Sequence, residues 1–490
     1  MARPRMTAWA AVVVGIGFAA IEAIVLNVRI RDYDEGVYWQ SIRALARGEP
    51  LFSSVFASQP PAFYYALLPF DVAGHAPASL RLGVLILGLV GLAATYVVGR
   101  LLAGPIAGLV AVLLAATSPL YLHQSAVVQA DGPAVAVSTV SVAFALLAVR
   151  ADGRKRDLLA AATGLTFVLA TGLKLLGAVT LVPLVIVLLS AGRGRTRLLV
   201  SATVGTLVGC LLMLLPVIGA PRAALDQVVL AHLRAGDPSR ANLSANLKVL
   251  LLHRELPLQA LAGLGVLNGL FRRNRAILVP LAWLVPSVLA VLFYHPLFPH
   301  HLVMLSLALA LVAAVGLTPH PAPNVSNARL ALKRRSRGPT GPPRKRGREM
   351  LPGLAALGLM LATAAAGVIV TVRDIQLALV PDLHNAEMIA AVGAVGRPGD
   401  FWISDNPYAI AAAGRDIPGP MVDTSSQRTR AGLLTVGDLE ATRVHYHVQW
   451  VLEDSFRLDG VPGYRGWLDQ HFHPIQNLGG RAVIYQLNGR

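Results

Sequence analysis

Runs of apolar residues, each about 20 positions long, follow one another through the first three quarters of the chain, with Gly, Pro and basic residues between them. A transmembrane α-helix needs about this length to cross the hydrocarbon core of a bilayer. The pattern therefore predicts about eleven transmembrane helices within residues 1–372. The first run is long and lacks a clear small-residue cleavage site, so we expect it to remain in the protein as a span.

Two parts of the chain depart from this pattern. The stretch 29–78 is expected to form a long first external loop, with a helix from Glu35 to Ala46 and a break at two consecutive prolines. Its aromatic residues predict a course along the membrane face, with these side chains at the level of the lipid headgroups: Tyr38, Trp39, Phe63, Tyr64 and Tyr65.

The second departure is the C-terminal part, residues 373–490, where the hydrophobicity drops. Helix-like and strand-like segments alternate there, which predicts a small α/β domain outside the membrane. The expected helices are Ala386–Val395 and Gly437–Thr442, and the expected strands are Asp400–Ser404, Val448–Leu452 and Arg481–Leu487. We expect a polytopic α-helical membrane protein with this domain at its end.

Composition supports the membrane assignment, because 55% of the residues are hydrophobic and only 14% are charged. The formal net charge of +17 comes largely from basic residues in alternate loops, which the positive-inside rule places in the cytoplasm. The N-terminus is then cytoplasmic and the C-terminal domain is outside the cell membrane. The basic stretch 319–350 is expected to be a disordered cytoplasmic loop near anionic lipid, and no nucleic-acid partner is expected. The single cysteine, Cys210, rules out an intramolecular disulfide.

An acidic cluster just beyond the first span carries the candidate chemistry. Asp32, Asp34 and Glu35 are costly beside a membrane unless they are solvated or functional. A carboxylate there is suited to accept a proton from a hydroxyl group while a lipid-borne substrate approaches through the bilayer. The alternative is a solvated turn after a helix.

The residues from Asp34 to Tyr38 (Asp-Glu-Gly-Val-Tyr), followed by Gln59 to Tyr65 (Gln-Pro-Pro-Ala-Phe-Tyr-Tyr), resemble the first-loop pattern of the protein O-mannosyltransferase and aminoarabinose transferase group. This group belongs to the C-type glycosyltransferase superfamily (GT-C). The resemblance covers roughly residues 7–320. It implies an inverting transfer of a mannose- or arabinose-type sugar from a polyprenyl-phosphate donor to an external protein, lipid or cell-wall glycan. It assigns the catalytic base to Asp34, with Glu35 beside it, and implies no obligatory metal or other cofactor.

One departure from the family pattern concerns the donor phosphate. Relatives usually have a lysine immediately before the paired prolines, where this chain has Gln59. Positive charge must then come from elsewhere. The candidate residues for binding the donor phosphate or the substrate are Gln59, Tyr64, Asp131, Lys174, Arg222, His300 and His301.

Each of these candidates also has a purely structural explanation. Lys174 is compatible with a side chain that reaches toward the interface from a helix end, Asp131 with a helix N-cap, and the two histidines with an interfacial position. A divalent metal beside the acidic cluster is compatible with the sequence but not favoured. Two other functions stay open: a transporter or flippase of lipid-linked sugars, and a non-catalytic protein of cell-envelope assembly.

Overall fold

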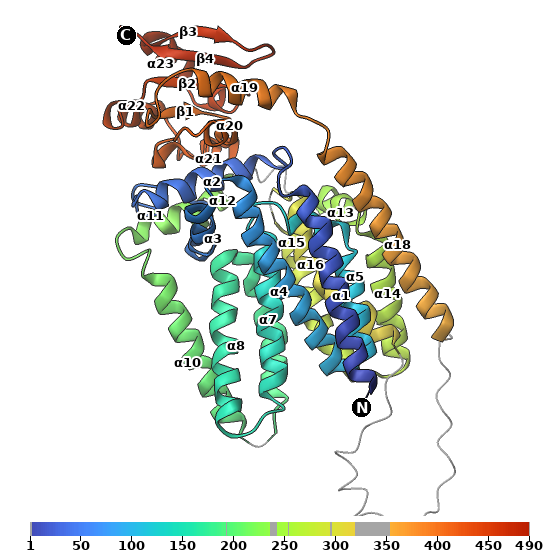
Figure 1. Cartoon of the computed structure of the whole chain (residues 1–490). Helices are drawn as coiled ribbons and strands as arrows, with labels where there is room; N and C mark the ends of the chain where they lie inside the picture. Colours follow the sequence, from blue (N-terminus) through green and yellow to red (C-terminus); the bar gives the residue numbers. More distant parts are fainter. Residues whose placement is uncertain are drawn as a thin grey trace, which may run out of the picture.

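The chain folds into a bundle of long apolar helices and a smaller module that contains a β-sheet (Figure 1). The structure, a computed structural model, describes residues 2–192, 194–235, 243–252, 254–294, 296–318 and 353–489. The expected basic loop 319–350 lies outside these residues. In Figure 1 the N-terminus lies at the end of the bundle opposite the module.

Eight helical segments in the described residues are long and apolar enough to cross a membrane. They are built on α1 (Ala2–Val25), α4 (Pro77–Ala103), α7 (Asp131–Ala148), α8 (Gly153–Leu173), α10 (Arg195–Leu214), η4 with α15 (Arg275–Ile277, Leu278–Leu292), η5 with α16 (Pro299–Leu302, Val303–Leu317) and α18 (Gly353–Ala378). Three shorter apolar helical segments accompany them: α5 (Pro105–Ala116), η1 with α9 (Leu175–Thr180, Leu181–Leu189) and α14 (Leu256–Phe271). The chain is a polytopic α-helical membrane protein, as expected.

Helix α16 forms the centre of the bundle, since all fifteen of its residues are buried. It packs against α14, α5, α15 and α7. Glycines permit close helix approach at two of the contacts. A Cβ at Gly316 of α16 would collide with the backbone of Gly265 in α14, and one at Gly205 of α10 would collide with Ala161 in α8. Small residues at such crossings let helices pack tightly within a membrane.

The loop after α1 contains α2 (Tyr33–Ala46) and α3 (Pro61–Gly74). Asp32 caps α2, because its side chain accepts a hydrogen bond from the backbone N–H of Asp34 at 3.0 Å. Pro61 begins α3, where the missing N–H of proline is harmless. Further short helices lie on the same side of the bundle or connect its spans: α6 (Pro119–Gln124), α11 (Pro221–Leu225), η2 (Asp226–Leu230), α12 (Ala231–Ala235) and α13 (Leu243–Leu252).

The aromatic residues of this loop do not all lie at headgroup level, contrary to expectation. Tyr38, Trp39, Phe63 and Tyr64 are buried, and only Tyr65 is exposed. The rings of Tyr38, Phe63 and Tyr64 pack edge to face with centroids 4.9–6.1 Å apart. The side chains are buried because α3 packs on α2, α4 and α8, and because Trp39 packs against Tyr408 of the C-terminal module.

The module contains a four-stranded sheet in the order β1-β2-β4-β3. β1 (Trp402–Ser404) pairs parallel with β2 (Trp450–Glu453), and β4 (Val483–Leu487) pairs antiparallel with both β2 and β3 (Phe472–Asn477). Its helices are α19 (Leu383–Ala394), α20 (Pro407–Ala412), η6 (Gly419–Met421), α21 (Ser426–Arg430), α22 (Val436–His445), η7 (Leu458–Gly460) and α23 (Tyr464–His471). The small α/β domain expected from the sequence is present, with β3 in addition.

The module docks on α2. A Cβ at Gly36 would collide with the backbone of Tyr408 in α20, and the Tyr408 ring lies 5.9 Å from that of Trp39. Gln40 donates a hydrogen bond to the carbonyl of Arg415 at 3.1 Å, and Arg43 forms an ion pair with Asp416 at 2.8 Å. The helix that bears the acidic cluster is therefore held between the bundle and the module.

Candidate functional site

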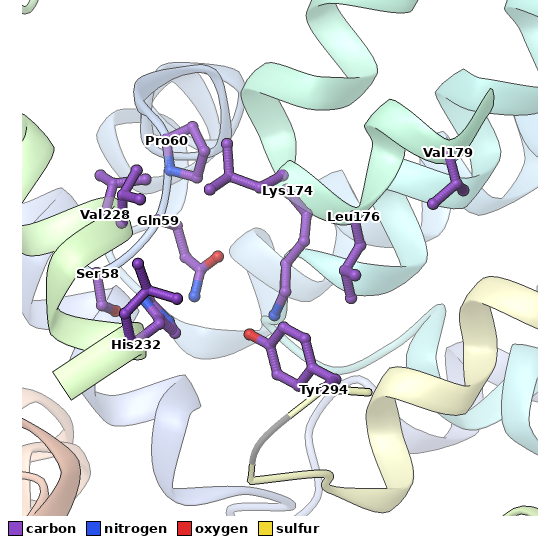
Figure 2. A pocket seen from close by; sticks show the side chains of 12 residues that line it. Ser58, Gln59, Pro60, Lys174, Leu176, Val179, Val228, His232 and Tyr294 are labelled. Atoms are coloured by element: carbon purple, nitrogen blue, oxygen red, sulfur yellow. The ribbon is translucent and has the colours of Figure 1, made fainter. Parts of the chain in front are cut away.

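Two cavities meet beside the first turn of α2. One of about 490 Å³, which we call the polar cavity, is bounded by Asp32 and Asp34, by the two histidines and by the module. The other, of about 260 Å³, is the apolar groove; its wall includes Leu175, Leu176, Val179, Val228, Val229 and Leu233. Five residues line both spaces: Ser58, Gln59, Lys174, His232 and Tyr294. Figure 2 shows that they come from the first loop, the end of α8, α12 and the segment after α15.

Asp34 lines the polar cavity from the first turn of α2 and is partly buried. No hydrogen-bond partner of its carboxylate is found among the described residues. Burial, together with the nearby carboxylates of Asp32 and Asp423, raises the pKa of Asp34 to about 8, although the positive charge of Lys174 acts in the opposite direction. A free carboxylate of this kind is suited to accept a proton.

Glu35 has a different environment, although it is the next residue. Its carboxylate is buried against Arg81 at 2.7 Å and accepts further bonds from the backbone N–H groups of Arg31 at 2.8 Å and Val128 at 3.0 Å. Burial opposes ionisation, but the Arg81 guanidinium and these backbone donors hold the pKa of Glu35 below its usual range. These contacts give Glu35 a structural role, in which it ties α2 to α4 and to the chain before α7.

Lys174 ends α8 and carries the positive charge where the two cavities meet. Its extended backbone breaks the helix before η1, and its buried Nζ lies 2.9 Å from Asp131 Oδ2. Figure 2 shows the Lys174 side chain running toward the ring of Tyr294. Asp131 lies in the first turn of α7, and its side chain does not cap that helix. Lys174 is thus buried inside the protein rather than extended to the interface, and Asp131 is its ion-pair partner rather than an N-cap.

His300 and His301 lie on η5, at the end of the central helix α16. His301 is buried; its Nδ1 accepts a bond from the N–H of Phe298 at 3.1 Å, and its ring packs on Tyr294 with centroids 4.5 Å apart. His300 lines the polar cavity with its Nδ1 3.9 Å from Asp32 Oδ2. The histidines therefore lie inside the site rather than at a lipid interface.

Asp131, His300 and His301 also form a cluster with the donor types of a divalent-metal site, with one ligand atom from each within 4.8 Å of the others. Two contacts oppose that use. Lys174 holds one oxygen of Asp131, and the backbone bond to Nδ1 of His301 places the proton of a neutral ring on Nε2. These contacts favour a hydrogen-bonded network around the lysine.

The remaining candidates divide between the site and its surroundings. Gln59 lines both cavities, donates a side-chain bond to the Tyr38 hydroxyl at 3.0 Å, and donates a backbone bond to the Tyr64 hydroxyl at 3.3 Å. Tyr64 is buried and lines neither cavity, so it supports the turn before α3. Arg222 is exposed on α11 and also lines neither cavity.

Sequence reasoning did not assign site roles to several residues that line the cavities. They are Ser58, His232 and Tyr294 in the membrane domain, and Asp423, Gln427, Arg430 and Arg457 in the module. His232 lies in a polar external segment, which was a usable signal. Nothing in the local sequence marks the module residues as site residues. They reach Asp32 and Asp34 only because the module docks on the first external loop, which is far away along the chain.

Comparisons with known proteins concern the family and the fold. Residues 58–219 match the family described as dolichyl-phosphate-mannose-protein mannosyltransferase. No curated protein sequence matches the chain. Solved structures match its fold. ArnT from Cupriavidus metallidurans, bound to undecaprenyl phosphate, is similar with a TM-score of 0.68 at 14% identity, covering 98% of this chain and 97% of that one.

More distant matches extend over the chain as well. The mycobacterial arabinofuranosyltransferase AftD gives a TM-score of 0.52 at 13% identity, covering 100% of this chain and 40% of that one. The oligosaccharyltransferase AglB from Archaeoglobus fulgidus, in complex with an inhibitory peptide and a dolichol-phosphate, gives a TM-score of 0.50 at 13% identity. The match covers 96% of this chain and 74% of that one.

Proposed function

We propose that this membrane protein, which has the GT-C fold of the glycosyltransferases it resembles, moves a sugar from a polyprenyl-phosphate donor to an acceptor hydroxyl outside the membrane. The donor sugar is of the mannose or arabinose type, and the acceptor is a lipid, a glycan or a protein. The N-terminus is cytoplasmic and the module extracytoplasmic, in the cell membrane. The reaction needs no bound cofactor.

The junction of the two cavities is the observation that carries this proposal. A prenyl chain is apolar and fits the groove walls formed by η1, η2 and α12. The phosphate that follows the prenyl chain then meets the five residues shared with the polar cavity. The sugar extends from there into the polar cavity, toward Asp34. This order of apolar, cationic and acidic surfaces matches the order of groups along such a donor.

Lys174 supplies the positive charge for the donor phosphate. Relatives usually place a lysine at the position of Gln59, whose neutral amide cannot replace that charge. The Lys174 ammonium faces both cavities, and the Asp131 carboxylate fixes it in place. Negative charge builds on the phosphate as it leaves, and a fixed cation in an enclosed site stabilises that charge.

Asp34 acts as the general base. It accepts the proton of the acceptor hydroxyl while the oxygen bonds to the anomeric carbon, and the bond from that carbon to the phosphate oxygen breaks. The polyprenyl phosphate leaves with the bonding electrons, and attack from the opposite face inverts the anomeric configuration. A base whose pKa lies near the working pH is both ionised and basic enough to accept the proton.

The test uses purified protein in lipid nanodiscs with labelled polyprenyl-phosphate mannose or arabinose as donor. Membranes from a strain that lacks this chain supply the acceptor. Asp34→Asn should fold normally and lose transfer, whereas Asp469→Asn, an exposed carboxylate of the module, is the matched control and should keep it. Undiminished transfer by Asp34→Asn would reject the assigned base. Movement of the donor across proteoliposome membranes without transfer would favour a flippase instead.

A further inference from the structure

The module forms one wall of the polar cavity, opposite the membrane helices. The lining residues come from the stretch before α21, from α21 itself and from the residue before η7: Asp423, Ser425, Ser426, Gln427, Arg430 and Arg457. None of them lines the apolar groove. We call this set the module wall.

Neighbouring contacts fix the module wall in position. Ser425 caps α21 by accepting a bond from the N–H of Arg428 at 3.3 Å. The Arg428 guanidinium packs over the Phe56 ring at 4.0 Å and donates to the carbonyls of Pro420 and Asp423 at 2.6 and 2.7 Å. Helix α21 also contacts α12 of the membrane domain. The wall is thus anchored to the first external loop and to the segment that carries His232.

Two arginines of the wall have no carboxylate partner among the described residues, unlike the paired arginines Arg443 and Arg465 of the same module. Arg457 packs over the Tyr33 ring at 3.8 Å and donates to the Ser455 hydroxyl at 3.0 Å, and both of these partners are uncharged. Arg430 is exposed to the cavity, and no ion pair to it is found in the described part of the chain. By contrast, Arg443 pairs with Glu440 at 2.6 Å and Arg465 pairs with Glu453 at 2.8 Å.

The only carboxylate of the wall does not neutralise these two charges. Asp423 is buried and accepts a bond from the N–H of Ser425 at 2.8 Å. The wall therefore presents two guanidinium groups to a cavity whose other side holds Asp32 and Asp34. Guanidinium groups bind carboxylates and phosphates through paired hydrogen bonds.

We propose that Arg430 and Arg457 bind an anionic group, a phosphate or a carboxylate, that the acceptor carries beside its reacting hydroxyl. This inference rests on the proposed function and names the acceptor as an anionic glycan or lipid. The donor phosphate is assigned to Lys174 because that residue borders the groove, whereas the two arginines border only the polar cavity. The anion then holds the acceptor on the side facing Asp34.

Equilibrium dialysis on the full-length protein tests this without turnover. The probes are labelled glucose 6-phosphate, glucuronate and glucose, and saturating decaprenyl phosphate fills the donor site. We expect both anions to bind about tenfold or more tightly than glucose, because hydrogen bonds from a guanidinium to an anion are stronger than those to a neutral hydroxyl. Equal binding of glucose and the anions would overturn the proposal.

Variants locate the anion. Arg430→Gln should weaken binding of both anions by about tenfold, because this side chain can be changed without loss of a described internal contact. Arg457→Gln should add to that loss, and Arg397→Gln, an exposed arginine outside the cavity, should bind like the unchanged protein. Unchanged binding by the double variant, or anion binding abolished by decaprenyl phosphate, would overturn the proposal. Because dialysis needs no transfer, loss of anion binding stays distinguishable from failure of the Asp34 test.

Discussion

Lys174 and Asp131 form a buried ion pair, with Nζ 2.9 Å from Oδ2, where the apolar groove meets the polar cavity. The pair combines a structural contact with the charge that the proposed reaction needs. We expect Lys174→Met to lower kcat for sugar transfer by about 10²–10³-fold, because the leaving phosphate loses its cation. Steady-state transfer from a polyprenyl-phosphate sugar measures this.

The same substitution leaves Asp131 unpaired, which should cost about 3–5 kcal/mol of stability. The double variant Lys174→Met with Asp131→Leu is therefore the control, since it removes both charges and should recover thermal stability without recovering transfer. Recovery of transfer in the double variant would mean that the lysine serves only the fold.

The pH dependence of transfer follows from Asp34. Burial and the nearby carboxylates raise its pKa to about 8, and only the ionised form accepts a proton. The rate should therefore rise with pH, about tenfold per unit well below pH 8, and level off above it. Asp34→Asn should lose about 10²–10⁴-fold in rate and lack this rise. A flat profile in the unchanged protein would argue against Asp34 as the base.

Glu35 should respond as a structural residue. Glu35→Gln leaves the Arg81 guanidinium buried without its charged partner, which should destabilise the fold by about 3–5 kcal/mol. Because the folded state holds the pKa of Glu35 low, its stabilising effect is present at neutral pH and is lost as the pH falls through that folded-state value. Thermal unfolding followed from pH 7 downward measures this.

The pair Glu35→Met with Arg81→Met removes both buried charges and should restore most of the stability lost in Glu35→Gln. If this double variant also transfers sugar, Glu35 has no direct part in the chemistry. A stable double variant without transfer would instead indicate that Glu35 takes part in the chemistry.

Gln59 lines both cavities, so a lysine there should approach the donor phosphate. We expect Gln59→Lys to lower KM for the polyprenyl-phosphate sugar by about tenfold, since an ammonium replaces a neutral amide near an anion. The matched control is Gln427→Lys, which lines only the polar cavity and should leave KM for the donor unchanged. If the two lysine variants lowered KM for the donor equally, the effect would reflect only a more positive potential across the site, not a phosphate near position 59.

Gly36 should be intolerant of any side chain. A Cβ there collides with the backbone of Tyr408, so Gly36→Ala should loosen the docking of the module on α2. Limited proteolysis between Ala378 and Leu383 should become faster, and transfer should fall, because Asp34 lies two residues before the contact. Gly48→Ala is a poor control, because Gly48 has a positive φ of 89°; Gly466→Ala, whose added Cβ meets no atom within 4 Å, is a suitable one.

The membrane architecture could be predicted from sequence because each span carries its own signal. Apolar runs of sufficient length form helices whatever their neighbours in the bundle. The helix of the first loop begins at Asp32, whose carboxylate caps it. The strands β1, β2 and β4 were expected near their observed positions. The edge strand β3 was not, since Phe472–Asn477 contains a proline and has mostly exposed residues.

The site was predictable only as far as local residues define it. Lys174, His300 and His301 line the polar cavity and Asp131 pairs with Lys174, but these contacts depend on helix packing that the spacing of residues along the chain does not predict. Tyr64 and Arg222 were chosen for their residue types and lie outside both cavities. The adjacent positions 34 and 35 differ in environment because one side chain faces the cavity and the other faces Arg81.

The contact of Tyr33 with Thr424 and Arg457 has a consequence for how the protein is made. The acidic loop is among the first segments to leave the ribosome, while the residues that close over it come near the end of translation. A nascent chain halted before residue 423 lacks the module wall, so its polar cavity would be open on that side. Under the proposed function, transfer is therefore expected only after the module has folded onto α2.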